Sequence, residues 1–379
     1  MSKPADIGPR DVGHEPPAPP TRVPEGTADP RPPDVGRRIQ PVDCLIVGGG
    51  PAGLSAAVYL GRMRRSTIVV DDRSGRSLWS QVNRNYLGFP DGIEAQELRK
   101  LGREQAARYG TVFCNGCVSH ISKRDELFRI QVGGPGPLDD EEGGTERNRK
   151  ADVAHGARLG EQQVQGRRAF YARTVLLATG VHDEFPDFAG RDECVGRSLF
   201  WCIICDGYEA IDKRVVVIGH DEEAVTTALQ LRQFSNTISL VAGQDGFAVP
   251  DDRLQDLAAA GIEAFPYAVQ EYPNGDGCLT AVHLADLPGT RLPLDLIFTV
   301  SPHHPNTGLA RELGVSLSPK GYILADAEQK TNVAGVYAAG DATRLHNHQV
   351  SSAVHEGGMA AAAVNYYLYG GVQKPQDSD

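Results

Sequence analysis

A short apolar run followed by closely spaced glycines is the feature that most limits how this chain can fold. Residues 44–47 form a buried-strand pattern that runs directly into Gly48, Gly50 and Gly53, in the spacing GxGxxG. The first glycine permits a tight turn, the second lets the backbone approach a pyrophosphate, and the third lets a helix pack on the strand. The helix predicted from about 51 to 60 would point its N-terminal N–H groups at those phosphates.

A second strand pattern supports the same interpretation. Residues 67–70 predict another buried strand, and Asp71 follows them where a carboxylate can bind the hydroxyls of a ribose. Pro51 and Ala52, at the start of the helix, complete the expected phosphate loop. A glycine-rich loop that binds nothing is the alternative, but the strands, the helix and the terminal acid together favour a dinucleotide site.

Two cysteines near the middle of the chain predict redox chemistry. Cys202 and Cys205 are separated by two residues, a spacing that can close a strained and readily reduced disulfide. Asp206 follows directly and can deliver and recover the proton of each thiol–disulfide step if partial burial raises its pKa. Half of a zinc site and a pair of buried core cysteines are the alternatives. Because no second cysteine or histidine pair follows at ligand spacing, we expect no metal.

The composition narrows the class of protein. With 379 residues and 40% hydrophobic content, the chain can form two domains with substantial cores. Its 38 basic and 49 acidic residues argue against nucleic acid as a partner. Seven cysteines in a long chain fit a reducing compartment, and we find neither a signal-peptide pattern nor a stretch long enough to cross a membrane. These features predict a cytoplasmic protein without a membrane partner.

Three segments are predicted to lie outside the folded domains. Residues 1–40 hold ten prolines and no aromatic residue, so they bury too little surface to offset the entropy of ordering. Residues 133–168 contain eight glycines, no aromatic residue and an acidic run, which predicts a disordered hairpin insertion. Residues 372–379 form a short tail.

Two further pairs of residues are assigned structural roles. Cys114 and Cys117 form a second CxxC, but the apolar residues around them predict strands on either side of an Asn-Gly turn or bulge, where a buried cysteine acts as a small hydrophobe. His303 and His304 lie between two prolines without other ligands nearby. This pattern predicts a loop or docking surface rather than a metal site.

A turn of small residues links these features to a known family. The strand pattern of residues 172–177 runs into Ala178, Thr179 and Gly180, which can lie close to a cofactor. With this turn, the GxGxxG loop, the CxxCDG motif and a closing motif at Gly340 and Asp341, the chain resembles the thioredoxin reductase family of flavoproteins. These are class II pyridine nucleotide-disulfide oxidoreductases.

The resemblance implies an α/β fold of two Rossmann-like three-layer domains, the second inserted into the first. Residues 41–189 and 295–371 would form the FAD-binding domain, and residues 190–294 would form an NAD(P)-type domain that carries the CxxC pair. Family members form homodimers, so the resemblance also implies a homodimer. The cofactor it implies is FAD.

The resemblance also implies roles for individual residues. Cys205 would lie against the flavin, Cys202 would be the interchange thiol that attacks the partner, and Asp206 would be the proton donor. Asn85 would lie in the flavin site, and the helix that follows Asp341 could stabilise negative charge on the flavin. The cofactor-binding residues expected from the motifs are Gly48, Gly50, Pro51, Ala52, Gly53, Asp71, Asn85, Thr179, Gly180, Gly340, Asp341, Gln349 and Val350.

The second domain departs from the family pattern. Residues 214–219 predict a strand and a glycine turn, but residues 220–223, His-Asp-Glu-Glu, replace the glycine-rich phosphate loop and place three carboxylates near the expected pyrophosphate. After the next strand, residues 242–244 read Ala-Gly-Gln where family members carry arginines for a 2′-phosphate, and Asp245 comes too late for an NAD carboxylate. We therefore predict that NAD(P)H binding is weakened or lost.

These observations predict an enzyme that passes two electrons between FAD and the Cys202–Cys205 pair, then to a disulfide of thioredoxin or a similar small protein. Because the nicotinamide site departs from the family pattern, the chain resembles the branch of the family that lacks NADPH-binding signatures, which includes deeply rooted and ferredoxin-dependent forms. The expected donor is therefore ferredoxin or a dithiol and not NADPH; an ordinary NADPH-dependent thioredoxin reductase is the alternative. A dithiol oxidase that uses oxygen is the rival enzyme class, although such relatives commonly show CxxCHG and Asp206 favours the reductase. A flavin-bound sensor without turnover is the third interpretation.

Overall fold

The computed structural model describes residues 40–79, 81–133, 162–164, 167–243, 246–285, 287, 289–344 and 346–370. The predicted N-terminal extension, apart from residue 40, the C-terminal tail and most of the predicted insertion at 133–168 lie outside the described residues. Gln244 and Asp245, on which part of the nucleotide prediction rests, also lie outside them. Among the described helices, none is long and apolar enough to cross a bilayer.

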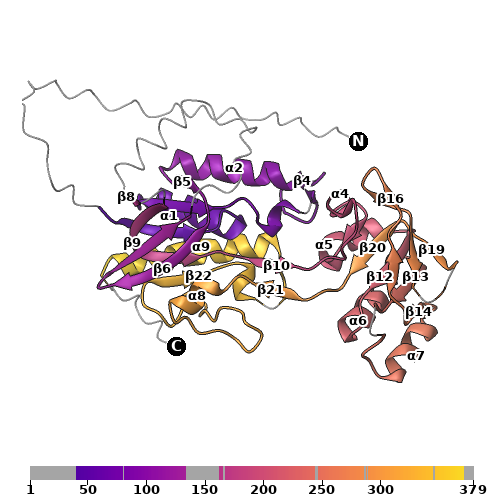
Figure 1. Ribbon diagram of the computed structural model, residues 1–379. Helices are drawn as coiled ribbons and strands as arrows, with labels where there is room; N and C mark the ends of the chain where they lie inside the picture. The colour runs from indigo at the N-terminus through magenta and orange to yellow at the C-terminus, as the bar shows by residue number, and fades with distance from the viewer. Residues whose placement is uncertain are drawn as a thin grey trace, which may run out of the picture. The chain divides into compact units, whose positions relative to one another are not determined.

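The first sheet is built around the predicted nucleotide-binding strand (Figure 1). Its strands follow the order β5-β2-β1-β9-β7-β6, and β8 and β22 also pair with β9. The pairs β1–β2, β1–β9, β2–β5 and β22–β9 are parallel, whereas β6–β7 and β7–β9 are antiparallel. The bounds are β1 Val42–Val47, β2 Thr67–Asp71, β5 Val112–Asn115, β6 Val118–Arg124, β7 Leu127–Val132, β8 Gln162–Val164, β9 Arg167–Leu177 and β22 Val336–Ala338.

The alternation of side chains along β1 gives this sheet two buried faces. Cys44 and Ile46 pack in one cluster with α1 (Pro51–Arg62) and α9 (Val350–Leu368), to which α2 (Ala95–Arg108) adds Ala106. Leu45 and Val47 pack in a second cluster that includes Ala310 of α8 (Gly308–Glu312). A strand buried on both faces reads as a continuous apolar run, which is why β1 was predicted without alternation.

The second sheet is parallel and also has three layers. Its order is β11-β20-β12-β13-β14, with bounds β11 Leu199–Phe200, β20 Leu296–Thr299, β12 Arg214–Ile218, β13 Thr237–Val241 and β14 Glu263–Phe265. Helices α6 (Glu222–Leu231) and α7 (Asp251–Ala259) share the cluster on one face. The antiparallel sheet of β15 (Val269–Glu271), β18 (Ala281–Leu284) and β19 (Arg291–Pro293) covers the other face. The α/β class with two Rossmann-like units is therefore confirmed.

Strand β20 corrects the predicted return to the first domain. Residues 295–299 were expected to belong to the FAD-binding domain, but β20 pairs in parallel with β12 and β11 in the second sheet. All four residues of β20 are buried, so their apolar character is the same in either sheet. Only the long-range pairing shows which sheet receives the strand.

The chain passes between the two sheets through a two-stranded ribbon. Strand β21 (His303–Pro305) pairs antiparallel with β10 (Val181–Asp183). The prediction of a loop at the histidine pair is therefore wrong. In this ribbon the His303 Nδ1 lies 2.6 Å from an oxygen of Asp183, and the His304 Nε2 lies 2.8 Å from an oxygen of Glu184. Each imidazole faces a carboxylate, so the ribbon is held by polar pairs.

The second CxxC lies in the first sheet. Cys114 is buried on β5 within a core cluster, and Cys117 is exposed; neither forms a disulfide. The strands predicted on either side are present, but β5 and β6 lie at opposite edges of the sheet and do not pair. Asn115 and Gly116 therefore connect two distant strands and do not form a hairpin turn.

Short elements complete the described chain. Strands β3 (Val82–Asn83) and β4 (Ile93–Glu94) pair with each other, as do β16 (Asn274–Gly275) and β17 (Cys278–Leu279). The remaining elements are the helices α4 (Arg191–Cys194) and α5 (Ile203–Asp206) and 3₁₀ turns at Arg76–Leu78, Gly207–Ala210 and Asp341–Thr343.

Candidate active site

A cavity of about 560 Å³ opens where the carboxyl ends of β1, β2 and β9 meet the CxxC helix. It brings together side chains that are far apart in the sequence. The cavity is lined by every residue expected at the site except Gly53, that is, by Gly48, Gly50, Pro51, Ala52, Asp71, Asn85, Thr179, Gly180, Cys202, Cys205, Asp206, Gly340, Asp341, Gln349 and Val350.

The glycine loop has the shape that a pyrophosphate needs. Gly48 has a φ of 106°, and a Cβ there would lie 2.3 Å from the carbonyl oxygen of Ala178. Gly53 lies under the loop, where a Cβ would lie 2.0 Å from the carbonyl oxygen of Gly48, so its role is the helix–strand contact that was predicted. The N-cap of α1 is Gly50, and no side chain caps it. The first N–H groups of α1 are thus left to an anion, which fits a dinucleotide cofactor.

Asp71, at the end of β2, lines the cavity and pairs with two arginines. Its Oδ2 is 2.6 Å from Nη2 of Arg99 and 3.6 Å from Nη1 of Arg103, both on α2. Arg99 is buried, it lines the cavity, and its Nη1 has no hydrogen-bond partner among the described residues. An unsatisfied buried donor at the wall of a cavity marks Arg99 as a candidate site residue, which no sequence motif predicted.

The CxxC pair forms a disulfide at the start of a short helix. Cys202 is the N-cap of α5, and its sulfur accepts a hydrogen bond from the backbone N–H of Cys205 at 3.1 Å. Its carbonyl oxygen accepts the N–H of Asp206 at 2.9 Å. The motif therefore sets its own local geometry, because the sulfur takes the capping position that serine or aspartate fills in other helices.

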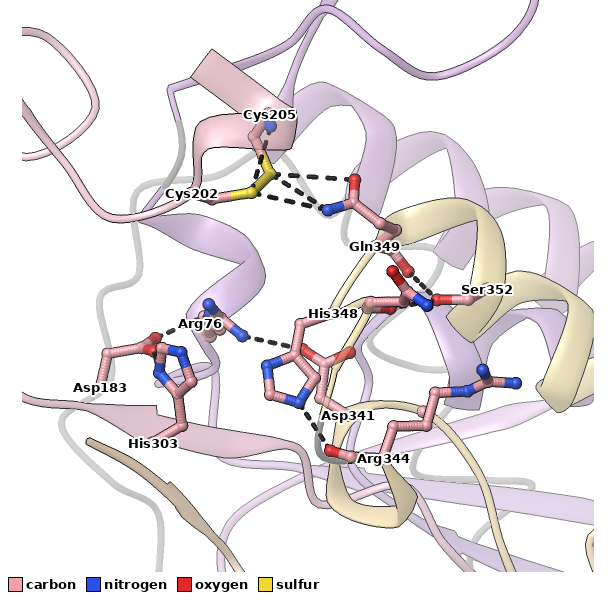
Figure 2. A network of polar contacts seen from close by, with 12 residues as sticks. Arg76, Asp183, Cys202, Cys205, His303, Asp341, Arg344, His348, Gln349 and Ser352 are labelled. Atoms are coloured by element: carbon pink, nitrogen blue, oxygen red, sulfur yellow. Dashed lines mark hydrogen bonds and ion pairs between the residues drawn. A yellow bond between two sulfur atoms is a disulfide. The ribbon is translucent and has the colours of Figure 1, made fainter. Parts of the chain in front are cut away.

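Gln349 contacts this disulfide from the opposite wall (Figure 2). Its Nε2 donates to the sulfur of Cys205 at 3.3 Å and to that of Cys202 at 3.6 Å. Asn85 Nδ2 donates to Gln349 Oε1 at 2.9 Å. Both amides were predicted as flavin-site residues, and the structure brings them together at the sulfurs.

Asp206 has the raised pKa that its predicted role as proton donor requires. The residue is buried, and this burial raises its pKa to about 7; Arg84 opposes the shift and Glu209 adds to it. The Nε of Arg84 lies 3.3 Å from a carboxylate oxygen of Glu209. Near neutral pH, Asp206 can therefore both give and accept a proton.

We expect this titration to be visible in the reaction. Because the raised pKa keeps Asp206 protonated below about pH 7, single-turnover disulfide reduction should fall as pH rises through about 7 on the high-pH limb of a bell-shaped profile. Asp206→Asn should remove that limb and lower the rate by about 10²-fold. Arg84→Met should move the limb to higher pH. An unchanged profile in Asp206→Asn would show that another group supplies the proton.

A second polar network lies beside the cavity and was not predicted (Figure 2). The Nε of Arg76 is 2.7 Å from Asp183, and its Nη1 is 3.4 Å from Asp341. The charge of Asp341, which lines the cavity, is therefore partly balanced by Arg76. His348 Nε2 donates to the carbonyl oxygen of Arg344 at 2.7 Å, and burial lowers the pKa of His348, which favours the neutral ring. No motif marks Arg76, because its partners are far away in the sequence.

Comparison with known proteins agrees with this geometry. The sequence profile of the pyridine nucleotide-disulphide oxidoreductase family matches residues 42–357, which is most of the chain. The chain belongs to this family. It is an FAD-dependent disulfide oxidoreductase of the thioredoxin reductase-like type, as the sequence motifs predicted.

Individual relatives in this family are distant but cover nearly the whole fold. A thioredoxin reductase of Treponema pallidum (strain Nichols) is 29% identical over 337 residues, 86% of this chain and 97% of that protein. The crystal structure of HlmI aligns with a TM-score of 0.72 and 29% identity over 87% of this chain and 93% of that one. The thioredoxin reductase of Streptococcus pyogenes MGAS5005 aligns with a TM-score of 0.73 at 22% identity, over 88% of this chain and 100% of that one, and shows the shared fold.

The second nucleotide loop differs from the first at the N-terminus of its helix. Asp221 is the N-cap of α6, and its Oδ1 accepts the N–H of Ala224 at 3.0 Å. Glu222 pairs instead with Arg253 of α7 at 2.7 Å. The predicted group of three carboxylates is therefore divided: one occupies the helix N-terminus, one is neutralised, and Glu223 is exposed. The N-terminus of α6 is therefore capped by a carboxylate of the chain itself, whereas no side chain caps α1.

Proposed function

We propose that this protein reduces a disulfide of thioredoxin or a similar small protein, with electrons that pass from FAD through the Cys202–Cys205 pair. The observation that carries the proposal is the disulfide on the wall of the dinucleotide-shaped cavity, next to Asp206 with its pKa of about 7. The curated relatives named thioredoxin reductase support the choice of partner. We also expect a homodimer, as the resemblance implies, and a cytoplasmic location, as the cysteine content predicts.

The residues present fit FAD as the cofactor. The loop from Gly48 to Gly50 and the uncapped N-terminus of α1 would hold the pyrophosphate, Asp71 would hold the ribose, and Asp341 would hold the ribityl chain. When bound, FAD supplies the hydride chemistry that links a donor to the disulfide. Thr179, Gly180 and Val350 form the rest of the wall around it.

The transfer to the partner is a thiol–disulfide exchange. Cys202 attacks one sulfur of the partner disulfide, a mixed disulfide forms, and the leaving sulfur takes a proton from Asp206. Cys205 then attacks Cys202, which restores the internal disulfide and releases the second partner sulfur. The proton that Cys202 loses before its attack restores Asp206. In total two electrons and two protons leave the enzyme, one proton by way of Asp206, and the partner disulfide becomes a dithiol.

We further propose that neither NADPH nor NADH is the main donor. The Asp221 carboxylate accepts the N–H of Ala224 at the start of α6, one of the donors that a pyrophosphate would use there. The sequence also lacks an arginine at residues 242–245 to bind a 2′-phosphate. Reduced ferredoxin or a dithiol is the donor class that this arrangement leaves open.

An experiment that does not depend on the natural electron donor distinguishes a thioredoxin-reducing enzyme from a dithiol oxidase. The purified protein is reduced anaerobically with a measured amount of dithionite and mixed with oxidised thioredoxin, and the new thioredoxin thiols are counted. We expect nearly stoichiometric transfer from the native protein. No transfer, together with rapid oxygen uptake when a small dithiol is added, would instead identify a dithiol oxidase.

The cofactor itself gives a further prediction. We expect the purified protein to be yellow and to release FAD on denaturation, because the loop at Gly48 and the carboxylate of Asp71 suit a dinucleotide. Chromatography of the released flavin distinguishes FAD from FMN. Release of FMN, or no flavin after reconstitution with FAD, would contradict the assignment of the cavity.

A further inference from the structure

The amide chain from Asn85 through Gln349 ends on the disulfide. Figure 2 shows its last link, from the Gln349 amide to the two sulfurs. We propose that this pair is a positioning device that holds an N–H donor on the sulfur of Cys205 and so keeps Cys205 as the thiolate after the disulfide is reduced. The proposal rests on the proposed function only in taking Cys202 and Cys205 as the redox pair.

The orientation of the Gln349 amide follows from its partners. Asn85 donates to Oε1 of Gln349, which leaves the NH₂ end of the Gln349 amide to donate to the sulfurs. Oε1 also lies near the Cys205 sulfur, at 3.8 Å, but Nε2 is nearer, at 3.3 Å. The main chain of Gln349 is held as well, because Ser352 Oγ donates to its carbonyl oxygen at 2.9 Å and its own N–H donates to Asn347 at 2.8 Å. Gln349 is the N-cap of α9, so the side chain projects from the start of a long helix.

The two sulfurs differ in the hydrogen bonds that they accept. Cys202 receives the backbone N–H of Cys205 at 3.1 Å, which the helical turn of α5 provides in any CxxC of this shape. Cys205 is the nearer sulfur to Gln349, at 3.3 Å against 3.6 Å for Cys202. Gln349 Nε2 is therefore the nearer donor to Cys205, and it reaches the sulfur from the opposite wall of the cavity.

Reduction changes the strength of this contact. A disulfide sulfur is a weak acceptor, whereas a thiolate makes a charge-assisted hydrogen bond. When two electrons break the Cys202–Cys205 bond, one sulfur can take a proton while the other keeps the negative charge. A donor fixed on Cys205 stabilises the state in which Cys205 is the charged sulfur, ready to resolve a mixed disulfide on Cys202.

The first experiment measures the pKa of Cys205 directly. In the full-length holoprotein with Cys202→Ser, the alkylation rate of the Cys205 peptide by iodoacetamide is followed by mass spectrometry across a pH series. A net hydrogen bond to a charged group corresponds to about one to two pKa units. Adding Gln349→Leu should therefore raise the pKa of Cys205 by about one unit.

Two variants with small changes in shape make the test specific. Asn85→Asp should turn the Gln349 amide, because a carboxylate accepts from its NH₂ end and leaves its oxygen toward Cys205, so the pKa of Cys205 should again rise. Gln349→Glu should raise it further, because it places a like charge at the sulfur. Gln233→Glu, on the exposed surface of the second domain, adds the same charge elsewhere and should leave this pKa unchanged.

A second readout uses the intact cysteine pair. In defined mixtures of oxidised and reduced dithiothreitol, Gln349→Leu should make the Cys202–Cys205 disulfide about tenfold harder to reduce, or about 30 mV more negative. If neither Gln349→Leu nor Asn85→Asp moves the Cys205 pKa or this equilibrium, the positioning role is wrong. If the variants shift both the Cys205 pKa and this equilibrium while the native protein fails to reduce thioredoxin, the positioning role stands and the proposed partner is wrong.

Discussion

Replacing either cysteine of the CxxC pair should lower thioredoxin reduction by about 10³-fold or more, because the covalent route loses its nucleophile or its resolving thiol. The two variants should differ in their spectra. In Cys202→Ser, the sulfur of Cys205, which is expected beside the flavin, stays as a thiolate and should give a long-wavelength charge-transfer band. Cys205→Ser should give no such band. Anaerobic spectra of the two flavin-loaded variants, together with the thioredoxin assay, measure both effects.

The second CxxC supplies the matched control. Cys114→Ser and Cys117→Ser change the same atoms in a pair that carries no disulfide, and both variants should retain thioredoxin reduction. Cys114→Ser places a hydroxyl in a core cluster, so it can lower stability without changing turnover per folded molecule. Loss of turnover in either variant while flavin stays bound would overturn the structural role assigned to this pair.

NADPH and NADH should reduce the flavin slowly, and only at concentrations well above those typical of nucleotide-dependent enzymes. A carboxylate about 4 Å from one phosphate charge opposes binding by about 1 to 4 kcal/mol, depending on the effective dielectric. The Asp221 carboxylate therefore weakens binding by about 5- to 1000-fold, and salt reduces this effect. Stopped-flow flavin bleaching under anaerobic conditions, with reduced ferredoxin and dithiols in parallel, measures the difference.

Asp221→Gly tests whether the Asp221 carboxylate is what weakens the binding of NADPH and NADH. Glycine is nearly as good an N-cap as aspartate and costs α6 only a few tenths of a kcal/mol, while it frees the N–H of Ala224 and removes the charge. We expect nicotinamide affinity to rise by about tenfold or more. Glu263→Gln removes an exposed carboxylate at the start of β14 and should have no such effect. Rapid, saturable bleaching of the native protein by micromolar NADPH would show that the second domain binds nucleotide as it stands.

The glycine loop and the CxxC motif were predictable because their geometry is local. The positive φ of Gly48, the contact under Gly53 and the N-cap position of Cys202 all follow from residues within one turn of chain. The Asp221 cap was also present in the sequence as an aspartate just before a helix. It was interpreted only as a repulsive charge, although the same carboxylate satisfies the helix N-terminus.

The sequence by itself therefore determined the two Rossmann-like units, the dinucleotide loop and the redox pair, since each depends on short-range backbone sterics and on side-chain periodicity. Only the tertiary structure decided which sheet receives β20, that Arg99 pairs with Asp71, and that Gln349 contacts Cys205. These contacts join residues far apart in the chain. Nothing in the local pattern specifies them, because they depend on how two sheets and their connecting ribbon bring distant side chains to one cavity.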